Sequence, residues 1–262
     1  MYATFETNTS YKYLKETIKA LHEPICILGG WAVFFHVNRR FKDAQGREYL
    51  GSRDIDLGFH FDKNASAQQI RQSSMAKALR VLQDKLKFKP ISFRLFKEIH
   101  IETGKELENG EKVPSYMIFP MYVDPIVDFI PKQFKSVFHF IPIDEPLLRF
   151  VFENEANREV LEEFNKKLWL PKPEILVAAK ISAVRNRDKE HKKIKDICDI
   201  FALLWYAGEE PAVLCKKVAM FLTKSEIKES LKILNDEDYE KAARQLGHEQ
   251  EQIKSIIELL SK

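Results

Sequence analysis

The chain has 262 residues, 45% of them hydrophobic and 31% charged, which is enough to bury a sizeable core in one large domain or two modest ones. Its net charge of +3 excludes a protein that binds nucleic acid over its whole surface and leaves only local basic sites. The three widely spaced cysteines, Cys26, Cys198 and Cys215, predict reduced buried thiols rather than disulfides or a zinc site. Without an apolar leader or a segment of bilayer length, the sequence predicts a soluble, cytoplasmic protein with no membrane partner.

The first half of the chain predicts helices and strands in alternation. Helical spacing, two-residue alternation and turn residues distinguish the elements from one another. In chain order, these are a helix at 11–21, a buried strand at 25–28, a helix at 31–37, a loop or short insertion at 38–51, a strand at 54–61, a helix at 67–86, a strand at 91–101 and a charged hairpin-like connection at 104–111.

Prolines and helical patterns set the expected fold class in the second half. Pro120 and Pro125 interrupt the apolar run at 116–130, which predicts short strands there, and residues 138–143 can add another. After Pro146 the long helical patterns lie at 174–187, 195–206, 212–222, 225–234, 236–246 and 249–260. Because the predicted strands come first in the chain and the long helices come later, the sequence predicts an α+β fold. A mixed sheet flanked by helices is expected at 1–144 and a helical C-terminal domain at 145–262.

Asp54 and Asp56 are the first candidates for chemistry. Residues two apart on a strand point to the same face, so these acids present paired carboxylates while Ile55 and Leu57 face the core. A cation is needed to neutralise such a pair, and oxygen ligands without a nearby His or Cys favour magnesium or manganese over zinc. A solvated strand edge also explains an isolated Asp-x-Asp, and on this pattern alone it is the better explanation.

Asp128 is a single acid within the apolar run at 126–130. An unpaired carboxylate buried there would destabilise the fold or take up a proton, so this acid needs a partner. A salt bridge to a Lys or Arg elsewhere in the chain would satisfy it. A role as third metal ligand, on a strand beside that of Asp54 and Asp56, would satisfy it equally well.

Gly29 and Gly30 follow a buried strand and precede a helix. Glycines at such a turn let backbone amides approach phosphate oxygens at the N-terminus of the helix. Glycines are common at such turns for geometric reasons alone, so the motif is weak by itself. Followed by the acid pair on the next predicted strand, it predicts a phosphate cradle that faces a metal site.

These motifs resemble the nucleotidyltransferase superfamily with the polymerase-beta-like fold. Members have a Gly-Gly or Gly-Ser turn, then Asp-x-Asp, then a third acid on a later strand, which correspond here to Gly29-Gly30, Asp54-Ile55-Asp56 and Asp128. The turn Gly29-Gly30-Trp31-Ala32-Val33 is similar to that of aminoglycoside nucleotidyltransferases and of AbiEii-type abortive-infection toxins. The stretch from Gly30 to Asp54 is longer than the usual pattern, which predicts an insertion at 38–51.

A second resemblance to the AbiEii-type family lies in the C-terminal half. Leu170-Pro171-Lys172-Pro173-Glu174 leads into a helix that carries Lys180, Ala183 and Arg187 on one face by three- and four-residue spacing. The resemblance implies that Lys180, Arg187 and Asp196 complete the nucleotide site, with Asp196 orienting one of the two cations, and that Ser52 belongs to it with the glycine turn. An exposed basic helix is the alternative explanation.

The resemblance implies transfer of a nucleoside monophosphate (NMP) from a nucleoside triphosphate (NTP) to an acceptor hydroxyl, with release of pyrophosphate. It implies magnesium, or manganese, held by Asp54, Asp56 and Asp128, with activation of the attacking hydroxyl at the metal. The acceptor would be RNA, including transfer RNA, bound by the basic residues near Lys192, or a small molecule of the aminoglycoside type. A catalytically silent module that binds a nucleotide, an RNA or an antitoxin protein is the alternative outside the enzyme class.

Overall fold

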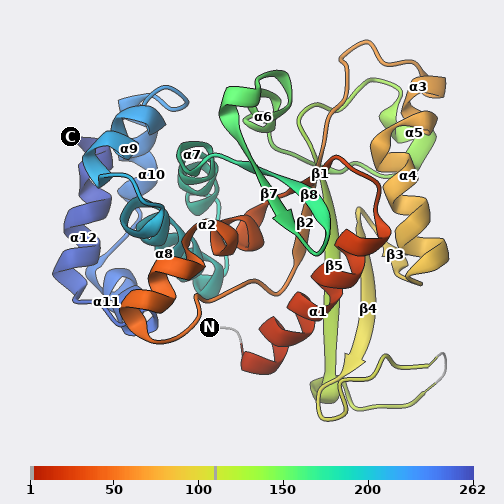
Figure 1. Ribbon diagram of the computed structural model, residues 1–262, viewed down its shortest axis with the longest axis horizontal. Helices are drawn as coiled ribbons and strands as arrows, with labels where there is room; N and C mark the ends of the chain where they lie inside the picture. Colours follow the sequence, from red (N-terminus) through yellow and green to blue (C-terminus); the bar gives the residue numbers. More distant parts are fainter. Residues whose placement is uncertain (1–2, 109–110) are drawn as a thin grey trace. The chain divides into compact units, whose positions relative to one another are not determined.

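The computed structural model describes residues 3–108 and 111–262 (Figure 1). Its contacts divide the chain into two compact units. Among the described residues, the sheet unit contains 3–31 and Gly51–Pro171, and the helical unit contains Ala32–Leu50 and Lys172–Lys262. The expected α+β class, with a mixed sheet, flanking helices and a helical C-terminal region, is confirmed. Over the described residues, no helix has both the length and the apolar character that crossing a bilayer requires.

The sheet unit is built on one mixed sheet whose eight strands, among the described residues, follow the order β3-β4-β5-β2-β1-β8-β7, with β6 beside β5. Three pairings are parallel, β1 with β8, β2 with β5 and β5 with β6, and the others are antiparallel. The strands are β1 (Ile25–Ile27), β2 (Ile55–Phe59), β3 (Lys89–Ile91), β4 (Arg94–His100), β5 (Ile118–Val127), β6 (Ile143–Asp144), β7 (Arg158–Glu163) and β8 (Lys166–Pro171).

The two faces of this sheet differ in burial. Along β4 and β5 the odd-numbered residues are buried, whereas the even-numbered residues, apart from Asp124, are only half-buried. Helix α1 (Thr4–Ala20) contacts β5 and the π-helical turn η1 (Val81–Lys85) (Figure 1). The centre of the Phe5 ring on α1 lies 6.0 Å from that of Phe119 on β5. The odd face therefore belongs to the core, and the half-buried even face is free to carry polar side chains.

The remaining helices of the sheet unit are short. They are α3 (Ala67–Gln72), α4 (Ser74–Arg80), α5 (Phe134–Phe138), α6 (Leu148–Glu153) and the 3-10 turns η2 (Ser115–Met117) and η3 (Glu155–Asn157). The single helix expected at 67–86 is interrupted at Ser73, whose backbone is extended and whose hydroxyl accepts a hydrogen bond from Ala76 N at 3.1 Å. A serine in this geometry caps a new helix. The region expected to form one helix therefore contains α3, α4 and the π-helical turn η1.

The prediction of short strands at 116–130 was wrong, because β5 runs unbroken through Pro120 and Pro125. Each proline lies where β5 has a partner on one side only. Pro120 pairs with Glu98 of β4 before β2 has joined, and Pro125 pairs with Leu57 of β2 after β4 has ended. A residue without an N–H is tolerated there because no second neighbour needs that donor.

The structure also contradicts the expected loop at 38–51, because α2 (Gly29–Gln45) continues through most of it. Val33, Val37 and Phe41 are fully buried at four-residue spacing, and polar residues between them obscure this stripe. Gly46, with a φ of +68°, ends the helix. The connection that remains is short, and in it Tyr49 N donates to Asn38 Oδ1 at 2.8 Å.

Strands β7 and β8 lie beyond the expected boundary near Asp144, in a region expected to be helical. They form a hairpin whose two turn residues, Phe164 and Asn165, both have positive φ. Such turns usually carry Asn-Gly or Asp-Gly, so Phe-Asn gave no signal in the sequence. The division into domains at 1–144 and 145–262 remains a prediction about folding units.

The helical unit is arranged around α8 (Glu190–Tyr206), which contacts α7, α9, α11 and α12 (Figure 1). Along α8 every residue from Ile194 to Leu204 is buried. The other helices are α7 (Pro173–Val184), α9 (Pro211–Val218), α10 (Lys224–Leu231), α11 (Asp236–Leu246), α12 (Gln250–Glu258) and the 3-10 turn η4 (Leu259–Ser261). The six predicted helices of this region are confirmed, and α11 has the predicted bounds.

Candidate functional site

Three carboxylates lie on the half-buried face of the sheet, on or beside two neighbouring strands. In the parallel pairing of β2 with β5, Asp56 lies opposite Asp124, and Asp54 is two residues before Asp56. Paired residues of adjacent strands point to the same side, as do residues two apart on one strand. We call Asp54, Asp56 and Asp124 the acid row. The predicted pair therefore has a third partner, although it is Asp124 rather than Asp128.

Arg94, at the start of β4, lies beside the acid row. Its Nε and Nη2 donate to the two carboxylate oxygens of Asp124 at 2.6 and 2.8 Å, and Nη2 also donates to Asp54 Oδ2 at 2.9 Å. Burial by itself lowers the pKa of Arg94, but the hydrogen bonds and charge of Asp124, and then those of Asp54, raise it above its ordinary value. One guanidinium thus neutralises part of the row and connects two of its members.

Asp56 lies against the turn that begins α2. Gly29 has a φ of +58°, and a Cβ on it would lie 1.8 Å from Asp56 Oδ2. A Cβ on Gly30 would lie 2.9 Å from the side chain of Ser52. The first amides of a helix lack intrahelical partners and favour negative charge. The structure therefore brings Gly29, Gly30, Ser52 and Asp56 together at a helix N-terminus, as the sequence predicted. Only glycine at positions 29 and 30 lets Asp56 and Ser52 approach the backbone this closely.

Gly29→Ala tests this closeness. Alanine adopts the left-handed conformation at a cost of about 1–2 kcal/mol, and its Cβ must also displace the Asp56 carboxylate. The matched control is Gly104→Ala, because Gly104 has a φ of +65° and nothing within 4 Å of an added Cβ. In urea denaturation, Gly29→Ala is expected to lose about 1–3 kcal/mol more unfolding free energy than Gly104→Ala. Equal losses would show that Asp56 does not depend on this contact.

Asp128 lies just beyond the end of β5, which is Val127. Its position is four residues beyond Asp124, which is about 13 Å along a strand. Its Oδ1 accepts from Phe61 N at 2.9 Å, and its Oδ2 makes a short contact with His60 Nδ1. The partner that a buried acid requires is therefore His60 and a backbone amide, and the structure does not bring Asp128 into the acid row.

The acid row consists of carboxylate oxygens, which are the ligands that a hard divalent cation prefers. It already holds one cationic group, the guanidinium of Arg94. Its side chains are accessible to different degrees, with Asp54 26% and Asp124 8% exposed. Among residues 3–108 and 111–262, however, no three His, Cys, Asp or Glu side chains lie close enough together to hold a metal ion. The row therefore offers the donor atoms that magnesium prefers but does not form a three-ligand metal site in this structure, in which Arg94 pairs with Asp54 and Asp124.

The other predicted residues, Lys180, Arg187 and Asp196, meet in the helical unit. Lys180 Nζ lies 2.8 Å from Asp196 Oδ1, and Arg187 Nε lies 2.6 Å from Asp196 Oδ2. Asp196 thus orients both cations. Lys180 Nζ also lies 2.7 Å from Asp199 Oδ2. The predicted trio is part of a larger buried charge network.

Asp199, Tyr49 and Lys195 also belong to this network, although the sequence analysis gave none of them a role in the site. Tyr49 Oη donates to Asp199 Oδ1 at 2.7 Å, and Lys195, one helical turn before Asp199, pairs with the same oxygen. Burial by itself lowers the pKa of Lys180, but Asp196 and Asp199 raise it above its ordinary value. Burial raises the pKa of Tyr49 further than any other cause. The spacing of Lys195 and Asp199 was the one available signal.

This network predicts a pH dependence of stability. Burial by itself raises the pKa of Asp199, but Lys180 and Lys195 lower it below the ordinary 3.8. A carboxyl group whose pKa is lower in the folded state stabilises that state above the unfolded pKa, and this contribution is lost as pH falls through the folded pKa. Unfolding free energies measured from neutral pH to below pH 3.8 should converge for the wild type and Asp199→Asn at the acid end. A constant difference would contradict this assignment.

The basic residues expected to bind RNA are largely engaged in ion pairs. Lys193 pairs with Asp238 at 2.7 Å, and Arg185 approaches Glu229 at 3.8 Å. Lys195 and Arg187 belong to the buried network described above. These ion pairs leave fewer basic side chains to bind the phosphates of an RNA. The alternative of an exposed basic helix does not describe this region either, because Lys195 and Asp196 are buried.

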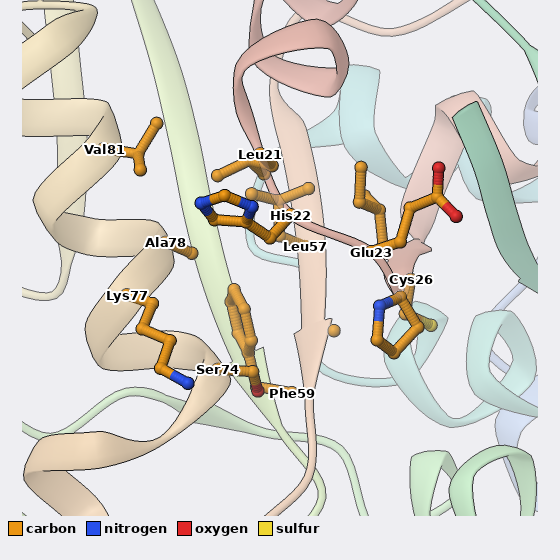
Figure 2. Close-up of a pocket in the computed structure, with 13 residues that line it drawn as sticks. Leu21, His22, Glu23, Cys26, Leu57, Phe59, Ser74, Lys77, Ala78 and Val81 are labelled. Atoms are coloured by element: carbon orange, nitrogen blue, oxygen red, sulfur yellow. The ribbon is translucent and has the colours of Figure 1, made fainter. Parts of the chain in front are cut away.

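A cavity of about 540 Å³ also lies in the sheet unit (Figure 2). Leu57 and Phe59 line it from β2, on the face opposite to Asp56, and His22 and Lys77 are its basic lining residues (Figure 2). Glu23 is its one carboxylate among the described lining residues, and its Oε1 accepts from Lys167 N at 3.2 Å. With an apolar wall and no acid pair, this cavity does not offer the chemistry of the acid row.

The comparisons with known proteins add little to this geometry. No model of a protein family matches the chain, and no curated protein matches it. One similar solved structure is that of an antigenic nucleotidyltransferase-like protein from Paracoccidioides brasiliensis, with 16% sequence identity and a TM-score of 0.34. The alignment covers 87% of this chain and 92% of that one. Likeness at this level supports neither an assignment of fold nor one of function.

Proposed function

We propose that the chain is a magnesium-dependent nucleotidyltransferase that transfers an NMP from an NTP to an acceptor hydroxyl and releases pyrophosphate. One observation carries the proposal: the acid row lies on one sheet face, and its member Asp56 lies against the Gly29-Gly30 turn at the start of α2. A row of carboxylates next to a helix N-terminus supplies cation ligands and phosphate-binding amides side by side.

In this proposal each part of the site has one task. Asp54 and Asp56 would hold the magnesium ion, and Asp124, which lies opposite Asp56, is the third acid of the row. A bound magnesium ion would neutralise the triphosphate and lower the pKa of the attacking hydroxyl. The amides at Gly29 and Gly30 bind phosphate oxygens, where their fixed direction favours the charge that develops during transfer. The role of Lys180, Arg187 and Asp196 in nucleotide binding remains an expectation from the family resemblance.

The transfer of label from an NTP to RNA or to a small molecule identifies the acceptor. The full chain is incubated with magnesium and each α-labelled NTP, with total RNA or a small-molecule extract, beside the double variant Asp54→Asn/Asp56→Asn. Label on RNA that the double variant does not produce would support a toxin-like enzyme of the AbiEii type. Label on a small molecule would support the aminoglycoside type of enzyme. If NTP disappears at the same rate with both proteins, the proposal is wrong.

A catalytically silent nucleotide-binding module is the second candidate, and the pairing of Arg94 with Asp54 and Asp124 favours it. Such a module would bind an NTP in the presence of magnesium, lose that binding in the double variant, and transfer no label to any acceptor. An antitoxin partner would fit this second candidate as well as the first.

A further inference from the structure

Arg94 is bound to the same carboxylates that the proposed function assigns to a cation. Its guanidinium makes three hydrogen bonds of 2.6–2.9 Å to two of the three acids. The contact with Asp124 is bidentate, which is the geometry in which arginine binds a carboxylate most strongly. Arg94 is also packed in place, because its Cζ lies 3.9 Å from the centre of the Tyr122 ring on the same sheet face.

This contact is set by the fold rather than by a flexible surface side chain. Leu95 pairs with Val123 in the antiparallel ladder of β4 and β5, which places Arg94 next to Asp124. The Arg94 side chain is 23% exposed and that of Asp124 is 8% exposed, so solvent screens the pair only in part. Two carboxylates on neighbouring strands repel each other unless a positive charge lies between them, and Arg94 supplies that charge without a metal.

We infer that Arg94 is the built-in counter-ion of the acid row and competes with a divalent cation for Asp54 and Asp124. The inference rests on the proposed function, since it concerns the same carboxylates. In the absence of a divalent cation, Arg94 holds the row together. When a divalent cation binds, Arg94 has to release Asp54, and this exchange lowers the affinity for the metal.

The competition is measurable as metal binding, without any turnover. Isothermal titration of Mn²⁺ into the full chain is expected to give an affinity at least ~10-fold higher for Arg94→Gln than for the wild type, because a positive charge next to the ligands is removed. Arg53→Gln is the matched control, because it removes an arginine that is next to Asp54 in the sequence. Arg53 pairs with Glu6 at 3.2 Å and lies over the Phe119 ring of the odd face. Its affinity should equal that of the wild type.

Arg94→Lys guards against a folding defect. Lysine keeps the charge but has no planar fork, so it should hold the acid row more weakly than arginine does and give an intermediate Mn²⁺ affinity. Circular dichroism and thermal melting of each variant verify that it is folded before titration.

The outcomes separate this inference from the proposed function. Mn²⁺ binding to the wild type that Asp54→Asn abolishes, but that Arg94→Gln and Arg94→Lys leave unchanged, overturns the role of Arg94 and leaves the metal site standing. Absence of Mn²⁺ binding in the wild type and in both folded Arg94 variants overturns the metal site and the inference together. Tighter binding in the order wild type, Arg94→Lys, Arg94→Gln supports the inference.

Discussion

Asp56→Asn is expected to reduce NMP transfer by about 10³-fold, because loss of a metal ligand removes several kcal/mol of transition-state stabilisation and each 1.4 kcal/mol is about tenfold in rate. Asn has the shape of Asp, so the contact with Gly29 is preserved and the loss is chemical rather than structural. The measurement is the rate of pyrophosphate release at saturating NTP and magnesium, once an acceptor is known.

Asp128→Asn is the control that discriminates between the two possible third acids. Asp128 pairs with His60 and Phe61 N, four residues along the sheet from the acid row, so its loss should affect stability more than the rate of transfer. If Asp128→Asn abolished transfer while remaining folded and Asp56→Asn retained it, the acid row would not be the catalytic site.

Lys180→Met should produce the largest loss of stability. Its ammonium lies 2.8 Å from Asp196 and 2.7 Å from Asp199, both almost completely buried, and removing it leaves these carboxylates with less compensation. Breaking a buried ion pair by removing one partner costs about 3–5 kcal/mol. Urea denaturation is expected to show a loss of this size, with Met retaining the apolar stem of the lysine.

Lys228→Met is the matched control, because Lys228 is exposed on α10 in the same unit. Its change in unfolding free energy should be within about 0.5 kcal/mol of zero. A Lys180→Met variant as stable as Lys228→Met, but unable to bind an NTP, would contradict the structural role and assign Lys180 to the nucleotide instead.

Local signals in the sequence were sufficient where the contacts themselves are local. The start of α2 at Gly29-Gly30 and the pair Asp54 and Asp56 follow from residues close together in the chain, and the helices after residue 172 follow from their apolar spacing. The meeting of Lys180 with Asp196 was also predicted, since the family resemblance placed both at one site.

The third acid depended on information that no local pattern contains. Asp124 and Asp128 lie four residues apart in the same apolar run, so both point to the same face. Which of them faces Asp56 is decided by the register of β2 with β5, a contact between segments almost 70 residues apart. Pro125 also argued against a continuous strand at Asp124, and its tolerance there depends on where β4 ends.

Arg94 was not predicted for a similar reason. An arginine at the beginning of a strand is usually solvated, and nothing in its neighbourhood in the sequence indicates an acid 30 residues away. The antiparallel pairing of β4 with β5 creates the contact. Counter-ions of this kind become visible only when the order and register of the strands are known.

The most direct test of the central claim is the fate of the phosphates. The full chain is incubated with magnesium, its acceptor and one NTP labelled at either the α- or the γ-phosphate. Nucleotidyl transfer predicts that α label appears on the acceptor and γ label in pyrophosphate, and that Asp54→Asn/Asp56→Asn abolishes both. Transfer of γ label to the acceptor, or release of γ label as inorganic phosphate alone, would contradict the proposed reaction.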